Sequence, residues 1–184
     1  FLVFIFILFG CSNTSFHTTS EISNEEQVTI LATAEAILQL PDVPHERTRN
    51  RELTKIIELL IHKKDGDTAK AYIDQITNWR AEVLKTQLAC LYMELGRTQQ
   101  AAELIQEVEV LAETIMGLKS GTLHAAGEYA SYLEAYDDFR IDRIKVGLSR
   151  YYLLLDDKTQ AETWSLDVLP AERAAFSRAS AAAL

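Results

Sequence analysis

The side chains that commonly hold metals or carry catalysis are present in this chain but scattered. The chain has four histidines, and none stands with another histidine, a cysteine or a carboxylate at the spacing of a metal site. They are His17, His45, His62 and His124. The chain also lacks a glycine-rich phosphate loop and a Gly-x-Ser-x-Gly nucleophile turn. The sequence therefore predicts no metal site, no cofactor and no catalytic residue.

Carboxylates are plentiful, and Glu103, Glu107 and Glu109 lie together on one predicted helix. A solvated helix face is the ordinary interpretation of such a group. A catalytic carboxylate pair, acting as general acid and base, is the alternative.

Three arginines are spaced to share one face of a predicted helix. Arg143 and Arg150 are seven residues apart, and Arg140 precedes Arg143 by one turn. A basic strip on an acidic protein can bind the carboxylates of an extended peptide through charge-assisted hydrogen bonds. Ordinary salt bridges with Asp138 or Asp142 are the alternative.

Composition indicates which elements must position these groups. The net charge is −9, and an acidic chain repels phosphate backbones, so we do not expect a nucleic-acid partner. Only 7 glycines and 3 prolines are present, which is few for a sheet protein with many tight turns. Apolar residues instead recur at spacings of three and four. The sequence predicts an all-α domain over residues 23–184.

Capping and breaking residues predict where the helices begin and end. Ser23 and Glu26 have capping-box spacing, and Pro41 and Pro44 end the first helix. Gly66 is expected to take a left-handed cap conformation. The clearest predicted loop is 117–121. The predicted helices span about 23–40, 44–63, 67–78, 79–95, 98–116, 122–136, 139–155 and 159–169, with a last one from residue 170.

Three segments share a turn, a threonine and a helix start, at residues 66–71, 96–101 and 157–162. The middle one follows a pattern of apolar, small, aromatic, glycine and alanine positions. These are Leu88, Ala89, Tyr92, Gly96 and Ala101. The third gives Leu148, Ser149, Tyr152, Asp156 and Ala161, and the first keeps only Gly66 and Ala71.

This pattern resembles the tetratricopeptide repeat. The resemblance covers roughly residues 50–170, and it implies antiparallel helical hairpins stacked as a short solenoid. Small residues would let two helices approach closely, and the aromatic residue would fill the space between hairpins. Generic antiparallel helices are the alternative.

The same resemblance implies a concave partner-binding face on the first helix of each hairpin. Carried over by position, that face contains Lys63, Lys64, Thr86, Met93, Glu94, Arg143 and Arg150. A second surface is suggested by Tyr129, Tyr132, Tyr136 and Phe139, which are spaced along one predicted helix face. We expect those aromatics to form core packing. An exposed peptide-binding strip or a self-association surface is the alternative.

The start of the chain is an apolar run that ends in Gly10-Cys11, followed by a Ser/Thr-rich segment. This resembles the signal of a bacterial lipoprotein, with residues 1–10 as signal, Cys11 as the acylated residue and residues 11–22 as a flexible tether. An uncleaved membrane anchor and a buried apolar strand are the alternatives. With Cys11 acylated, Cys90 is expected to be a small core residue rather than a reactive thiol.

Residues 11–15 and 27–38 are similar to the mature start of NlpI-type outer-membrane lipoproteins. In that family the repeat domain is a homodimeric adaptor that presents cell-wall hydrolases to a periplasmic protease. The resemblance implies an outer-membrane, periplasm-facing, lipid-anchored adaptor that binds a protein or peptide partner and can form a homo-oligomer. An envelope enzyme acting on cell-wall or peptide substrates and a structural self-associating subunit are the alternatives.

Overall fold

The fold is built from helices. The computed structural model describes residues 23–121, 135–166 and 168, and in these residues it contains seven α-helices and no strand. The helices are α1 (Asn24–Leu38), α2 (Asp42–His62), α3 (Gly66–Ile73), α4 (Arg80–Glu94), α5 (Thr98–Ser120), α7 (Asp138–Leu154) and α8 (Lys158–Ser165). The predicted all-α fold class is confirmed.

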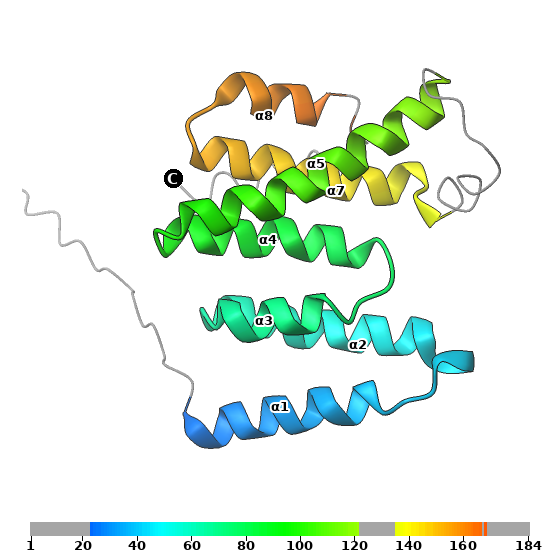
Figure 1. Ribbon diagram of the computed structural model, residues 1–184, viewed down its shortest axis with the longest axis vertical. Helices are drawn as coiled ribbons and strands as arrows, with labels where there is room; N and C mark the ends of the chain where they lie inside the picture. Colours follow the sequence, from blue (N-terminus) through cyan, green and yellow to red (C-terminus); the bar gives the residue numbers. More distant parts are fainter. Residues whose placement is uncertain (1–22, 122–134, 167, 169–184) are drawn as a thin grey trace, which may run out of the picture.

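Three pairs of helices form antiparallel hairpins, which are α2 with α3, α4 with α5, and α7 with α8 (Figure 1). The first helices of successive hairpins also pack on each other, α2 on α4 and α4 on α7, while α1 packs against α2. α4 therefore contacts four other helices, α2, α3, α5 and α7. The predicted helical hairpins are confirmed, and the tetratricopeptide-like solenoid stays a prediction.

The helices α2, α4 and α7 run in the same direction, so the molecule has two different ends (Figure 1). One end, called the turn end, holds the short connections from α2 to α3, α4 to α5 and α7 to α8. The opposite end, called the loop end, holds the beginnings of α2, α4 and α7 and the connection from α3 to α4.

The three turns at the turn end have the same backbone geometry. One residue in each is left-handed, with φ of 63° at Lys64, 73° at Gly96 and 58° at Asp156. The next amide donates to a carbonyl five residues earlier, from Asp65 to Leu60 (2.9 Å), Arg97 to Tyr92 (2.8 Å) and Asp157 to Tyr152 (3.0 Å). These are Schellman motifs, which close a helix by bonding its last carbonyls.

This geometry corrects the predicted register of the first repeat. Lys64, and not Gly66, takes the left-handed conformation, and Gly66 is the first residue of α3. The equivalent of Ala101 is then Ala69, which is fully buried, whereas Ala71 is exposed. The prediction was wrong because it aligned the glycines, and a lysine fills the glycine position here.

Aspartates cap the second helix of two hairpins. Asp65 accepts a hydrogen bond from the Thr68 amide at 3.2 Å, and Asp157 accepts one from the Gln160 amide at 3.1 Å. At the N-terminus of α1 the predicted cap is confirmed, because Ser23 accepts from the Glu26 amide at 3.2 Å.

Close packing fixes the spacing of the hairpins at two points. The Tyr92 ring of α4 lies against Gly66, where an added Cβ would stand 2.7 Å from a ring carbon, and the Tyr92 hydroxyl donates to the Gly66 carbonyl at 3.2 Å. This confirms the predicted place of the aromatic between two hairpins. Between α4 and α7, Gly147 lies directly against the buried Thr86 side chain.

Several predicted boundaries were wrong. α5 continues through Gly117 to Ser120, so the predicted loop 117–121 is mostly helix, and only Gly121 is left-handed, with φ of 74°. α2 already begins at Asp42, which places Pro44 inside its first turn, where a proline needs no backbone donor. α3 ends at Ile73, earlier than predicted.

Some predictions fall on residues outside the described part of the chain. These are the signal 1–10, Cys11, the tether 11–22, most of the predicted helix 122–136 with His124, Tyr129 and Tyr132, and the last helix from residue 170. Among the helices that are described, none has the length and apolar character needed to span a bilayer.

Candidate partner-binding surface

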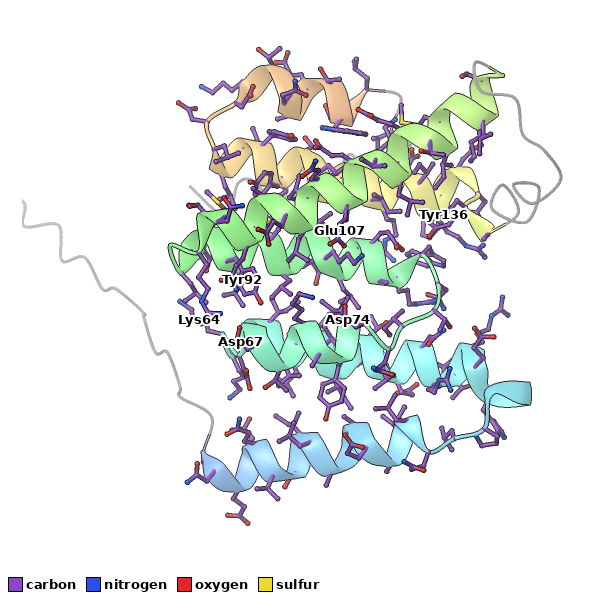
Figure 2. The ribbon with its side chains drawn as sticks, in the orientation of Figure 1. Lys64, Asp67, Asp74, Tyr92, Glu107 and Tyr136 are labelled. Atoms are coloured by element: carbon purple, nitrogen blue, oxygen red, sulfur yellow. The ribbon has the colours of Figure 1, made fainter. Side chains whose placement is uncertain are left out.

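Four of the predicted partner-binding residues lie at the turn end. Lys63 is paired with Glu26 of α1 at 3.0 Å, and Lys64 is the exposed left-handed residue after α2. Met93 packs against the core, while Glu94 is exposed at the last turn of α4. Figure 2 shows Lys64 at this end, close to Asp67 and Tyr92.

The residues predicted on the other helices do not continue this surface. Thr86 is buried between α4 and α7 and is not available to a partner. Arg150 is half-buried, and its Nε is enclosed without a hydrogen-bond partner. Arg143 is exposed, but it lies in the first half of α7, toward the loop end. The predicted face is therefore divided between the two ends of the molecule.

Arg143 instead belongs to a group of arginines at the loop end, which we call the arginine cluster. Its members come from the first halves of three parallel helices, and the charges of four of them act on the fifth, Arg80, at the start of α4. They are Arg47 and Arg51 from α2, Arg80 from α4, and Arg140 and Arg143 from α7. Three of the five are exposed and the other two are half-buried.

Two aromatic rings lie within the arginine cluster. The Arg80 guanidinium stands 4.6 Å from the centre of the Trp79 ring, and the Arg143 guanidinium stands 6.0 Å from the same ring. Arg143 also lies 5.6 Å from the Phe139 ring, which is 46% exposed. Cation–π contacts of this kind orient a guanidinium while its edge stays open to hydrogen bonding.

The positive charges of the arginine cluster act on one another. Burial lowers the pKa of Arg80, and the positive charges of Arg140, Arg143, Arg47 and Arg51 lower it further. Carboxylates offset part of this charge, because Arg51 pairs with Glu52 at 2.9 Å. Arg140 likewise lies 3.4 Å from a carboxylate oxygen of Asp137. Within the described residues, neither Arg47 nor Arg80 forms an ion pair.

Sequence analysis found Arg140 and Arg143 but missed the other three members. Arg47 and Arg51 are one turn apart in α2, and Arg80 follows Trp79 directly. The spacing of residues along one helix does not show which arginines of other helices lie beside them. The alternation of arginines in residues 47–51 and the Trp-Arg pair were the signals available.

The three carboxylates on α5 contact three different partners. Glu107 pairs with Lys85 at 2.8 Å, and Glu109 accepts a hydrogen bond from the Tyr152 hydroxyl at 2.6 Å. Glu103 accepts one from Gln99 at 3.0 Å. These contacts are those of carboxylates on a solvated helix face.

The described aromatics of the predicted stripe do not share a helix face. Tyr136 lies in the segment just before α7 and is buried. Its hydroxyl donates a hydrogen bond to Glu82 at 3.2 Å. Phe139 belongs to the first turn of α7 and is exposed. The prediction of core packing therefore holds for Tyr136 and not for Phe139.

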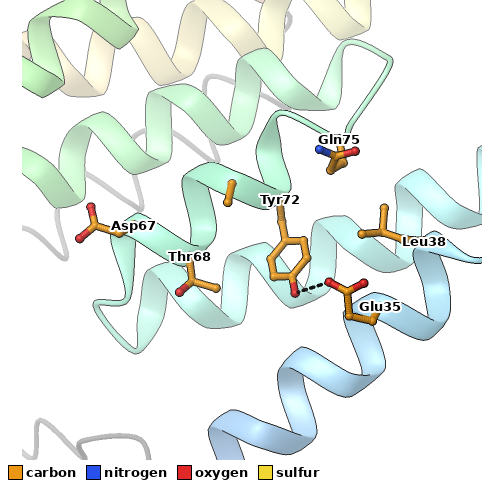
Figure 3. A pocket seen from close by; sticks show the side chains of 7 residues that line it. Glu35, Leu38, Asp67, Thr68, Tyr72 and Gln75 are labelled. Carbon is orange, nitrogen blue, oxygen red and sulfur yellow. Dashed lines mark hydrogen bonds between the residues drawn. The ribbon is translucent and has the colours of Figure 1, made fainter.

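A shallow groove of about 450 Å³ lies between α1 and α3 (Figure 3). Glu35, Asp67 and Gln75 line it with Tyr72, whose hydroxyl donates to Glu35 at 3.4 Å. The groove is open and its two carboxylates stand at different ends, so it offers no enclosed site for chemistry.

Neither a metal site nor a reactive thiol is found in the part of the chain that the structure describes. No group of three or more possible ligands from histidine, cysteine, aspartate and glutamate comes together there. Cys90 is buried, and burial raises the pKa of its thiol to about 11, which keeps it protonated. The prediction that Cys90 is a core residue is confirmed.

Comparisons with known proteins leave the arginine cluster as the main guide to function. No known protein family, curated protein or solved structure matches the chain.

Proposed function

We propose that this protein is a non-catalytic adaptor of the bacterial cell envelope that binds a protein partner through its loop end. A lipid on Cys11 would hold it at the outer membrane, facing the periplasm. The observation that carries the proposal is the convergence of five arginines and two aromatic rings from three helices on one surface. Arginine and aromatic side chains are the residues that most often dominate binding at protein interfaces.

The shape of the described domain supports binding over catalysis. The groove between α1 and α3 is open, and the carboxylates on α5 are spread over separate contacts. A partner that covers the loop end would contact α2, α4 and α7 together. Such a surface suits an adaptor, because it needs a rigid support and no enclosed reaction space.

Copurification from envelope extracts tests the proposal. The full chain is compared with the double variant Arg80→Glu/Arg143→Glu, which should lose a specific protein that the wild type retains. The matched control is Lys70→Glu/Lys158→Glu, which makes the same change of charge at exposed sites on α3 and α8. Equal retention by all three chains, or equal loss in the control, would contradict binding at the loop end.

The lipid anchor is tested separately. Metabolic labelling with a clickable fatty acid should mark the wild type and not Cys11→Ala, and the labelled protein should fractionate with the outer membrane. Labelling of the Cys11→Ala chain would contradict acylation at this residue.

A further inference from the structure

The arginine cluster stands where positive charge is costly for the fold. Arg80 is the first residue of α4, and Arg140 lies in the first turn of α7. The helix dipole makes cations unfavourable in a first turn, and neighbouring like charges add to that cost. An anionic ligand bound beside these arginines would reduce the repulsion between them.

The chemistry of the arginine cluster indicates which anion fits. A guanidinium presents donors in a planar fork that matches a carboxylate with two parallel hydrogen bonds. Trp79 lies beside the guanidinium groups of both Arg80 and Arg143, which limits the orientations available to them. The exposed Phe139 ring offers contact to an apolar side chain next to those carboxylates.

The spacing of the helices sets the length of the ligand. Packed helices lie about 8–10 Å apart, so the arginines on α2 and those on α7, with α4 between them, are separated by about 18 Å. An extended peptide covers about 3.3 Å per residue, so about five or six residues span this distance. The net charge of −9 would repel a long polyanion beyond the cluster, which favours a short acidic segment.

We propose that the arginine cluster binds an extended acidic segment of a partner protein, about six residues long, with side-chain carboxylates on the arginines and an apolar residue on Phe139. This rests on the proposed adaptor function and names the partner chemistry that the loop end recognises. The carboxylates bridge α2, α4 and α7, and Trp79 keeps two of the arginines in place.

Fluorescence anisotropy with the full chain tests the proposal. The probe is a labelled Glu-Glu-Phe-Ala-Glu-Glu peptide. It is blocked at both ends, so that its only carboxylates are those of the side chains. It should bind the wild type more weakly as salt is added. Binding should fall at least about tenfold in Arg80→Gln/Arg143→Gln, because charge-assisted hydrogen bonds are lost. Lys70→Gln/Lys158→Gln is the matched control and should bind as the wild type does.

Two further probes separate the sources of affinity. The peptide with glutamine in place of every glutamate should not bind, and the peptide with alanine in place of phenylalanine should bind more weakly. Equal binding of the glutamate and glutamine peptides would overturn the proposal. Binding of soluble short-chain phosphatidylglycerol in place of the acidic peptide would also overturn it, because the arginine cluster would then serve lipid headgroups.

The outcome can be told apart from failure of the adaptor function. If a protein copurifies with the wild type and is lost in Arg80→Glu/Arg143→Glu while the acidic peptide fails to bind, the adaptor function stands and the acidic-segment proposal is wrong. If the peptide binds as expected but no protein is retained, the ligand chemistry stands and the adaptor function is wrong.

Discussion

The turn end of the molecule repeats a backbone conformation, whereas the loop end repeats a side-chain type. At the turn end the backbone repeats, because three turns share one hydrogen-bond pattern with a lysine, a glycine or an aspartate at the left-handed position. At the loop end a side-chain type repeats, because arginines from three helices meet on one surface. The first arrangement joins helices into hairpins, and we propose that the second serves a partner. Substitutions at the two ends should therefore affect different measurements.

Overpacking the turn end should give the largest loss of stability. Ala101 is fully buried where α5 leaves the turn, and the adjacent Ala102 is exposed. Ala101→Leu should lower the free energy of unfolding by about 3 kcal/mol, because the crossing has no room for a larger side chain. Urea denaturation measures this, and Ala102→Leu is the matched control with a change below about 0.5 kcal/mol. Similar losses in both variants would show that the crossing is not tightly packed.

Adding glycine at the other two turns should raise stability. Lys64 and Asp156 hold a left-handed backbone that costs a side-chain-bearing residue about 1 kcal/mol or more, and glycine avoids that cost. Lys64→Gly and Asp156→Gly should each raise the free energy of unfolding by about 1 kcal/mol. Gly96→Ala, the reverse change, should lower it by a similar amount. Destabilisation by both glycine variants in thermal denaturation would contradict the shared turn geometry.

A carboxylate at the loop end should make stability depend on pH. Burial raises the pKa of Glu82 from its ordinary value of 4.5, although its own backbone hydrogen bond, Lys85 and Tyr136 oppose this. The folded protein then holds this proton more tightly than the unfolded chain, so the contribution is present below the unfolded pKa and is lost as pH rises through the folded pKa. Relative to Glu82→Gln, the wild type should therefore lose stability as pH rises above the ordinary pKa of 4.5.

Parallel urea titrations of the two chains at several pH values measure this difference. The effect should be smaller than that of the turn substitutions, because Glu82 is only half-buried. A wild type that gains stability relative to Glu82→Gln over this range would show that the favourable contacts of the carboxylate outweigh its burial.

Removing one charge from the arginine cluster should have the smallest effect on stability. Arg47 is exposed and forms no ion pair with the described residues, so Arg47→Gln should change the free energy of unfolding by less than about 0.5 kcal/mol. The same variant should weaken binding of the acidic peptide. A loss of more than about 1 kcal/mol in urea denaturation would assign Arg47 a structural role and weaken the contrast between the two ends.

The turn end could be predicted from the sequence more fully than the loop end. Gly96 and the apolar spacing on α4 and α5 identify one hairpin, because local backbone preferences act over a few residues. The repeat pattern placed Asp156 at the position of that glycine, and its positive φ confirms this. The equivalence of Lys64 was not visible, since a lysine does not indicate a positive φ. The predicted register of the first repeat was wrong by two residues. It aligned Gly66 with Gly96 by residue type, whereas Lys64 has the matching backbone conformation.

The loop end could be predicted only in part, because its members are distant in the sequence. Arg140 and Arg143 were found from their spacing on one helix, but Arg80 reaches them only through the packing of α4 against α7. Lys63 and Met93 were assigned to a partner, whereas the fold uses them in an ion pair and in core packing. Helix packing decides which charged residues share a surface, and a single sequence does not record it.

The position of α4 has a consequence for how the molecule opens. Because α4 is packed on four neighbours, its central amides should exchange with deuterium only when two hairpins separate together, while those of α1 and α8 exchange first. A ligand held across the beginnings of α2, α4 and α7 would join the same three units from outside. If the ligand contacts all three helices, its addition should slow amide hydrogen exchange in α2, α4 and α7 together.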